Sequence, residues 1–247
     1  MRFLKIMLTL MLSLVILAAC SNGSTDGLII PKISEYKISD LSGAEYDVGS
    51  VTLSTKAEAL EAFKKAYSGL ENIDFMENVG MNPSISRAMS DAHSFTSNEL
   101  AKYGVTDLAG KISYSGTKTS MAMNFDVSGK YTSDTDTTQS YYKDGSHWIR
   151  GKFRTTGFMN YKESGKTENV DMGLAASYAL ALKDGTDSAK FVLNFGLAAS
   201  MSIDAYGHET YNGKPLFYGT LKVYKNDGTQ IFDFQLTEDE LGEFMLF

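Results

Sequence analysis

The chain has 247 residues, of which 43% are hydrophobic and 21% charged, and its formal net charge at pH 7 is -7. This acidic balance argues against nucleic acid or an anionic headgroup surface as a binding partner. Cys20 is the single cysteine, so no intramolecular disulfide can form and packing has to stabilise the fold. The length suits one domain, and no interior segment rich in proline, glycine or serine divides the chain.

The first 20 residues have the order of an export signal. Residues 1–5 carry two positive charges, residues 6–17 are almost entirely apolar, and small residues follow. The apolar stretch is shorter than a typical membrane span. The sequence Leu17-Ala18-Ala19-Cys20 resembles the lipobox of bacterial lipoproteins. An ordinary cleaved signal peptide or an uncleaved anchor are the alternatives.

The lipobox resemblance implies that residues 1–19 are a signal peptide and that Cys20 carries the lipid as the first mature residue. The membrane is then a partner through this anchor, and two or three acyl chains make the attachment effectively permanent. The implied location is the cell envelope. Ser21 after the cysteine is compatible with the outer membrane if the host is Gram-negative. Removal of Arg2 and Lys5 changes the net charge from -7 to -9.

Behind Cys20 the composition indicates a tether and then one β-rich domain. Residues 20–30 begin small and polar, which predicts a lipidated flexible tether, and the domain is expected over 31–247. Residues 33–52 mix short apolar alternations with glycines and predict a weak strand pair.

Helices are expected over about 55–103. Residues 55–58, Thr-Lys-Ala-Glu, fit a capping box at the start of a helix. A helical stripe that we expect to face the core follows; it consists of Leu60, Phe63, Tyr67 and Leu70, with Ala59, Ala62 and Ala66 beside it. Over 82–103, Asn82-Pro83 and the run at 96–99 are further helix-start signals.

From Lys111 onward the hydrophobic period changes to two. Residues 121–128 alternate between large apolar and small or polar side chains, as in a half-buried strand. Three Asp-Gly dipeptides, at 144–145, 184–185 and 227–228, lie between strand-like runs. Asp-Gly favours two-residue hairpin turns, so the chain is expected to form an antiparallel meander of about seven to nine strands.

A two-residue turn at Asp184-Gly185 predicts the register of the central hairpin. Leu180 would then lie opposite Ala189 and Tyr178 opposite Phe191. The bulky apolar residues fall on one face, and the other face is nearly all small. The pentapeptide Gly-Leu-Ala-Ala-Ser occurs at 173–177 and again at 196–200, which indicates either a shared surface requirement or chance.

The other two Asp-Gly turns predict registers in the same way. Around 227–228, Val223 would oppose Phe232 and Leu221 would oppose Phe234. Around 144–145, Tyr141 would oppose Trp148. Trp148 with its aromatic neighbours could form a binding patch, although cross-strand packing is the favoured interpretation.

The predicted fold class is α+β. It is a curved antiparallel β-meander, a half-barrel or barrel-like sheet, with N-terminal helices packed on its bulky face. This outline is similar to the half-barrel envelope carriers of the LolA and LppX kind, which hold lipid on an apolar concave face. The similarity is one of architecture.

The sequence predicts neither an enzyme nor a cofactor. The three histidines lack metal-ligand spacing, and no nucleophile elbow, phosphate loop or dinucleotide motif is present. No catalytic, cofactor-binding or metal-binding residue is proposed. Met121, Met123 and Phe125 are the weak candidates for ligand contact, because flexible thioethers suit an adaptable lipid pocket.

Three functions remain open. The first is an envelope lipoprotein that binds or carries a hydrophobic ligand such as lipid. The second is a structural or surface-interaction lipoprotein without a small-molecule ligand. The third is a small integral outer-membrane barrel, suggested by the alternation over 189–203 and the terminal Phe247, although lipidation and a capped helix weigh against it.

Overall fold

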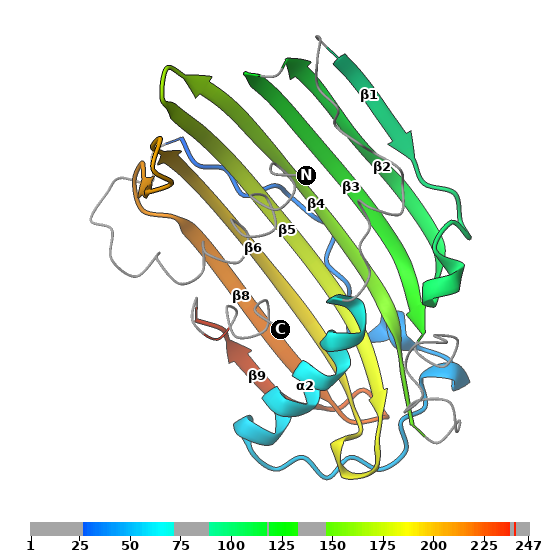
Figure 1. The fold of residues 1–247 in the computed structure, drawn as a ribbon. Coiled ribbons are helices and arrows are strands. Elements are labelled where there is room, and N and C mark those ends of the chain that lie inside the picture. The colour runs from blue at the N-terminus through cyan, green and yellow to red at the C-terminus, as the bar shows by residue number, and fades with distance from the viewer. Residues whose placement is uncertain (1–26, 72–88, 118, 133–146, 238–239, 241–247) are drawn as a thin grey trace.

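One open, curved antiparallel sheet of nine strands dominates the computed structural model, which describes residues 27–71, 89–117, 119–132, 147–237 and 240 (Figure 1). The strands are β1 (Met89–Ser94), β2 (Val105–Thr117), β3 (Ser120–Thr132), β4 (Trp148–Ser164), β5 (Thr167–Lys183), β6 (Ala189–Ile203), β7 (Glu209–Tyr211), β8 (Leu216–Tyr224) and β9 (Gln230–Gln235). The α-helix is α2 (Lys56–Glu71), and short 3₁₀ helices are η2 (Ile38–Leu41), η3 (Ala44–Tyr46), η4 (Ala101–Tyr103) and η7 (Gly185–Asp187).

The strand order is β1-β2-β3-β4-β5-β6-β8-β9, and β7 pairs with the remaining part of β6. The predicted meander and the α+β class are therefore confirmed. The two ends of the sheet differ. The end with the β5–β6 turn lies beside α2 and is called the helix end below. The opposite end, which holds the β4–β5 turn, is called the methionine end after Met121, Met123, Met159, Met172 and Met201.

Helix α2 begins at the predicted capping box and packs on the concave face of the sheet. The Thr55 hydroxyl accepts a 3.2 Å hydrogen bond from the Glu58 amide, and the Glu58 carboxylate accepts one of 3.2 Å from the Thr55 amide. Phe63 and the alanines at 59, 62 and 66 are buried, whereas Leu60 and Tyr67 are half-buried at the edges of the stripe. The expected core-facing stripe is thus confirmed over its described side chains.

The helical prediction for 82–103 is wrong where the structure describes that segment. Residues 89–94 form β1, which pairs along 111–116 of β2. This short polar segment has no apolar stripe that a helix could bury, whereas pairing with the edge of β2 satisfies its backbone hydrogen-bonding groups. The helix-start signal at Thr96 is real, since Glu99 accepts a 3.0 Å hydrogen bond from its amide. Only one 3₁₀ turn follows, because Gly104 takes a left-handed conformation (φ +80°) and ends it. Asn82 and Pro83 lie outside the described residues.

The central hairpin has the predicted faces but a different register. Leu180 pairs with Phe191 and Tyr178 with Leu193, a shift of two residues. The shift arises because the turn is longer than two residues: it contains η7, and the Ser188 hydroxyl bonds to both the Asp184 amide (2.9 Å) and the Gly185 carbonyl (2.9 Å). An even shift keeps every side chain on its predicted face.

The last hairpin has the predicted register in its strands. Val223 pairs with Phe232 and Leu221 with Phe234. The loop has three residues rather than two, with Gly228 at φ +86°, and a bulge beside Tyr224 compensates for the extra residue. The first Asp-Gly turn, with Tyr141, lies outside the described residues. Trp148 itself is buried on the convex face.

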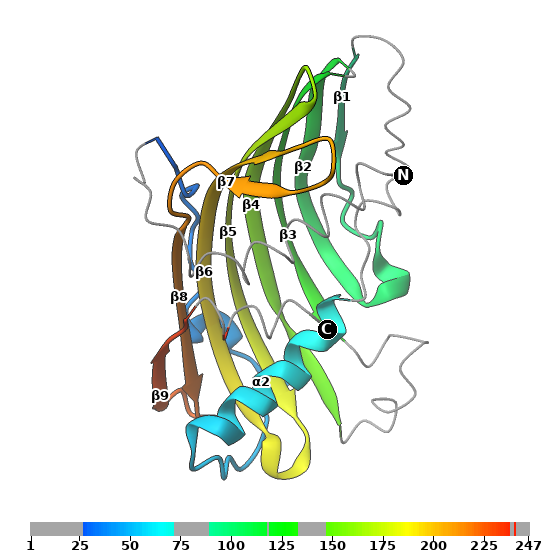
Figure 2. The same ribbon diagram turned by 60° about the vertical axis from the view of Figure 1, so that its left-hand side comes forward.

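Residues 28–50, called the strap below, cross the convex face of the sheet, opposite α2 (Figure 2). The expected strand pair over 33–52 is wrong: the segment forms 3₁₀ turns η2 and η3 within irregular chain. It lies over the sheet face instead of along an edge, so no strand ladder is within reach. Apolar side chains of the strap and of the sheet pack together there; they are Leu41, Tyr46, Val48, Trp148, Ala179, Ala181, Val192 and Tyr224.

Polar contacts also hold the strap. The buried Ser177 hydroxyl accepts a 2.8 Å hydrogen bond from the Tyr36 amide and donates one of 2.6 Å to Asn194. The side-chain amide of Asn194 in turn donates a 3.2 Å hydrogen bond to the Glu35 carboxylate. The face of the central hairpin that carries small side chains is therefore packed against the strap rather than exposed to solvent.

The strap reaches the sheet at two glycines, one from each Gly-Leu-Ala-Ala-Ser copy. A Cβ added at Gly173 would lie 2.5 Å from the Ile29 carbonyl oxygen, and one added at Gly196 would lie 2.5 Å from Ile30 Cγ2. The segment expected as a free tether over 20–30 thus already contacts the domain at Ile29. The shared glycine is consistent with the shared-surface interpretation of the repeat.

We expect Gly173→Val to displace the start of the strap and to lower the free energy of unfolding by about 1–3 kcal/mol, because the added side chain overlaps backbone. Ala122→Val is the control, since Ala122 lies on the same convex face and lines an open pocket; its effect should stay within about 0.5 kcal/mol. Urea denaturation of the two purified variants in mild detergent measures both. Equal effects would show that the strap does not need Gly173.

Candidate functional site

The described residues offer no metal centre. In this part of the chain, no three His, Cys, Asp or Glu side chains come together in a way that could hold a metal ion. Each histidine approaches a carboxylate in a different part of the fold, at 2.6 Å for His93, 3.3 Å for His147 and 2.9 Å for His208. The concave face of the sheet is the remaining candidate for a ligand-binding site.

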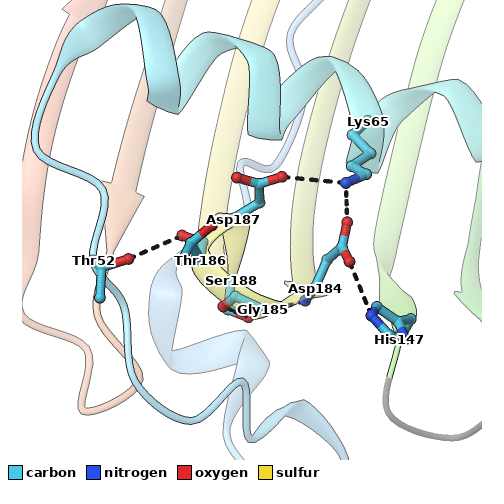
Figure 3. A network of polar contacts seen from close by, with 8 residues as sticks. All are labelled: Thr52, Lys65, His147, Asp184, Gly185, Thr186, Asp187 and Ser188. Atoms are coloured by element: carbon cyan, nitrogen blue, oxygen red, sulfur yellow. Dashed lines mark hydrogen bonds and ion pairs between the residues drawn. The ribbon is translucent and has the colours of Figure 1, made fainter.

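At the helix end, this face is closed by α2. Phe63 packs edge-on against Phe191 of β6, and Tyr67 packs edge-on against Tyr178 of β5. Lys65 completes the contact, because its ammonium group lies between the carboxylates of Asp184 and Asp187 in the β5–β6 turn (Figure 3). These aromatic and ionic contacts position the helix.

The buried carboxylate of Asp184 is the centre of the polar contacts in Figure 3. It pairs with Lys65 from α2, and its other oxygen lies 3.3 Å from His147 Nε2. The Thr52 hydroxyl donates a 3.2 Å hydrogen bond to the Thr186 carbonyl in the same turn. A cation beside a buried carboxylate offsets its loss of hydration, so this cluster holds the helix at a defined place.

We expect Lys65→Met to lower the free energy of unfolding by about 2 kcal/mol, because a buried carboxylate loses its ammonium partner. Lys64→Met is the matched control one residue away. Its pair with the exposed Glu61 (3.4 Å) contributes about 0–0.5 kcal/mol. Urea denaturation compares the variants. A loss as large for Lys64→Met would mean that general helix effects, not the Asp184 contact, decide the result.

At the methionine end, the concave face presents five thioethers from four adjacent strands. Met123, Met159 and Met172 pair in one row across β3, β4 and β5. Met121 and Met201 lie in the next row, separated by Tyr161 and Val170. The exposed fractions of the five methionines are 0–7%. The result is a buried, deformable apolar surface.

The structure brings all three sequence-predicted contact residues to this face. Met121 and Met123 are buried, and the half-buried ring of Phe125 lies over Gly157, where an added Cβ would be 2.4 Å from the ring. Met159, Met172 and Met201 were missed. Their alternation within β4, β5 and β6 was visible in the sequence, but only the strand register places them beside Met123 and Met121.

Tyrosines border this apolar surface and supply hydroxyl groups. Burial and the nearby Glu168 raise the pKa of Tyr161 to about 12, and burial and Glu209 raise the pKa of Tyr211 to about 12. Both hydroxyls therefore stay protonated. The buried hydroxyl of Tyr211, next to Met201, has no hydrogen-bond partner among the described residues. It can donate a hydrogen bond to an oxygen atom of a ligand.

An open pocket of about 650 Å³ lies at the methionine end near the turns of β2–β3 and β4–β5. Polar residues of the convex face dominate its lining, among them Ser115, Asn160, Lys162, Asn169 and Asp171. Met121 and Tyr161 reach it from the other face. This pocket is a polar depression beside the methionine surface rather than an apolar cavity.

No family model, curated protein or solved structure matches this chain. The similarity to half-barrel carriers stays a prediction at the level of outline, and Cys20 lies outside the described residues. None of the helices in the described ranges has the length and apolar character needed to cross a membrane.

Proposed function

We propose that this protein is a lipid-anchored protein of the bacterial envelope that binds an amphipathic ligand through the concave face of its sheet. Cys20 is the proposed acylation site, and the outer membrane is the proposed location in a Gram-negative host. No catalytic step is proposed.

The observation that carries the proposal is the methionine surface. Five thioethers on adjacent strands form an apolar face that can repack around chains of different shape. The Tyr211 hydroxyl at its border would meet the polar end of the ligand. An acyl lipid has an apolar chain that suits the methionine surface and a polar end that suits the bordering hydroxyl.

Burial of an acyl chain is energetically sufficient. At ~0.8 kcal/mol for each methylene, about ten buried groups give roughly 8 kcal/mol before the costs of association. Micromolar affinity corresponds to about 8 kcal/mol of net binding energy. Micromolar affinity therefore requires an acyl chain of more than about ten carbons.

A fluorescent fatty acid titration tests the proposal. We expect saturable binding with micromolar affinity, weakened about tenfold or more in Met123→Trp, because the indole fills space that the acyl chain needs. Asn124→Trp is the matched control: Asn124 is the next residue of β3 and is exposed on the convex face. Equal weakening in the two variants would show that the fatty acid does not bind at the methionine surface.

A structural or surface-interaction lipoprotein is the second candidate. The low exposure of the methionines favours it, because a protein core filled by its own side chains gives the same burial. This account expects no binding of the fatty acid at high micromolar concentration and a loss of about 1–3 kcal/mol of stability on enlargement of any core methionine.

A further inference from the structure

We propose that the methionine end of the sheet faces the bilayer that holds the anchor, with Tyr206 in contact with the lipid surface. This inference rests on the lipidation of Cys20 in the proposed function. It assigns a membrane-contact surface to the folded domain itself and fixes the orientation of the concave face.

The reach of the N-terminal segment restricts the orientation. Nine residue steps join Cys20 to Ile29, so this segment spans at most about 30–32 Å in any conformation. Ile29 contacts Gly173, six residues from the methionine-end terminus of β5 at Thr167 and ten from its helix-end terminus at Lys183. At about 3.3 Å for each residue these distances are roughly 20 and 33 Å. The methionine end is therefore well within the reach of the anchor, whereas the helix end lies at or just past the limit of a fully extended segment.

A strongly exposed apolar side chain, that of Tyr206, lies at the methionine end, whereas the exposed Ile29 lies farther along β5 on the convex face. Within the described residues, the large hydrophobic side chains that remain exposed are Ile29 (65%) and Tyr206 (87%). Tyr206 follows β6 in the loop toward β7, and Ile29 is the residue through which the strap meets β5. Exposed tyrosine side chains of this kind insert into the boundary between headgroups and acyl chains.

The loop that carries Tyr206 is fixed by its own hydrogen bonds. Asp204 Oδ1 accepts hydrogen bonds from the amides of Tyr206 (2.8 Å) and His208 (2.9 Å), and the Asp204 carbonyl accepts one of 3.0 Å from Gly207. The hydrogen bonds that the Asp204 carboxylate accepts from His208 and then from the Tyr206 amide lower the pKa of Asp204. An ordered loop holds the aromatic ring outward, so its insertion costs little conformational entropy.

Charges near this end leave the apolar contact as the main attraction. Lys162 and Lys166 in the β4–β5 turn are exposed, but Glu163 is exposed beside them and Glu168 follows. The contact is therefore expected on zwitterionic lipid, as a second weak attachment beside the acyl anchor. In this orientation an acyl chain could pass from the bilayer to the methionine surface over a short path through water.

Quenching of tryptophan fluorescence by brominated phospholipid tests this orientation in vesicles of zwitterionic phosphatidylcholine that carry the lipidated protein. The chain has one tryptophan, Trp148, buried at the helix end. In Tyr206→Trp, we expect brominated lipid to reduce the added emission about twofold or more. In Thr186→Trp, the exposed control in the β5–β6 turn at the helix end, the added emission should be unchanged.

Flotation of the protein with the vesicles is measured first. Failure to float would overturn the anchor of the proposed function and this inference with it. Flotation without quenching of Tyr206→Trp, or with equal quenching of Thr186→Trp, would overturn the orientation alone. Binding of a fatty acid by the protein in detergent is a separate result that neither outcome changes.

Discussion

Replacement of Leu193 by Asp is expected to lower the free energy of unfolding by several kcal/mol, about 4 or more, and to leave little folded protein. Leu193 is 1% exposed on the concave face of β6, between Tyr178 and Leu221 of the neighbouring strands. A carboxylate there would be buried among apolar groups without a cation.

The control for Leu193→Asp is Ser200→Asp on the same strand. Ser200 is half-buried on the convex face, and its hydroxyl accepts a 3.3 Å hydrogen bond from the Asn212 side chain. A carboxylate can accept the same bond, so we expect a change within about 1 kcal/mol. Urea denaturation compares the two variants. Equal losses would contradict the facial assignment of the central hairpin.

Replacement of Cys20 by Ser is expected to abolish acylation and to leave an unprocessed precursor. The thiol is the acceptor in the proposed lipid attachment, and the chain has no second cysteine to replace it. Metabolic labelling with a fatty acid gives the result directly. Ser21→Ala is the neighbouring control and should keep the label. Label retained by Cys20→Ser would contradict the lipoprotein assignment.

Local signals in the sequence were sufficient for the elements that depend on local physics. The capping box at Thr55 and Glu58 forms as predicted because its donors and acceptors lie three residues apart. The strands of the last hairpin take the predicted register, with Leu221 opposite Phe234, because a short turn joins them.

Contacts between distant segments limited the prediction. The length of the β5–β6 turn depends on hydrogen bonds of Ser188 and on the contact between Lys65 and Asp184, which an Asp-Gly dipeptide does not reveal. The strap was not predicted because its contacts, such as Tyr36 with Ser177, join residues far apart in the chain. The only sequence signal of the strap was the set of small side chains on one face of the central hairpin.

The sequence predicted only part of the candidate site, because the rest depends on contacts between distant segments. The alternation at Met121 and Met123 placed both side chains on the core face of one strand. Neither the third strand of the methionine row nor the border tyrosine Tyr211 could be assigned without the registers of β5, β6 and β7.

Native mass spectrometry tests the central claim, the binding of an acyl lipid by the folded domain, most directly. The lipidated protein is incubated with phospholipid in detergent, transferred to the gas phase, and compared with a sample extracted with organic solvent. We expect a species heavier by one phospholipid than the anchored chain, lost on extraction and depleted in Met123→Trp but not in Asn124→Trp. A spectrum with only the anchored chain at high micromolar lipid would contradict the proposed binding function.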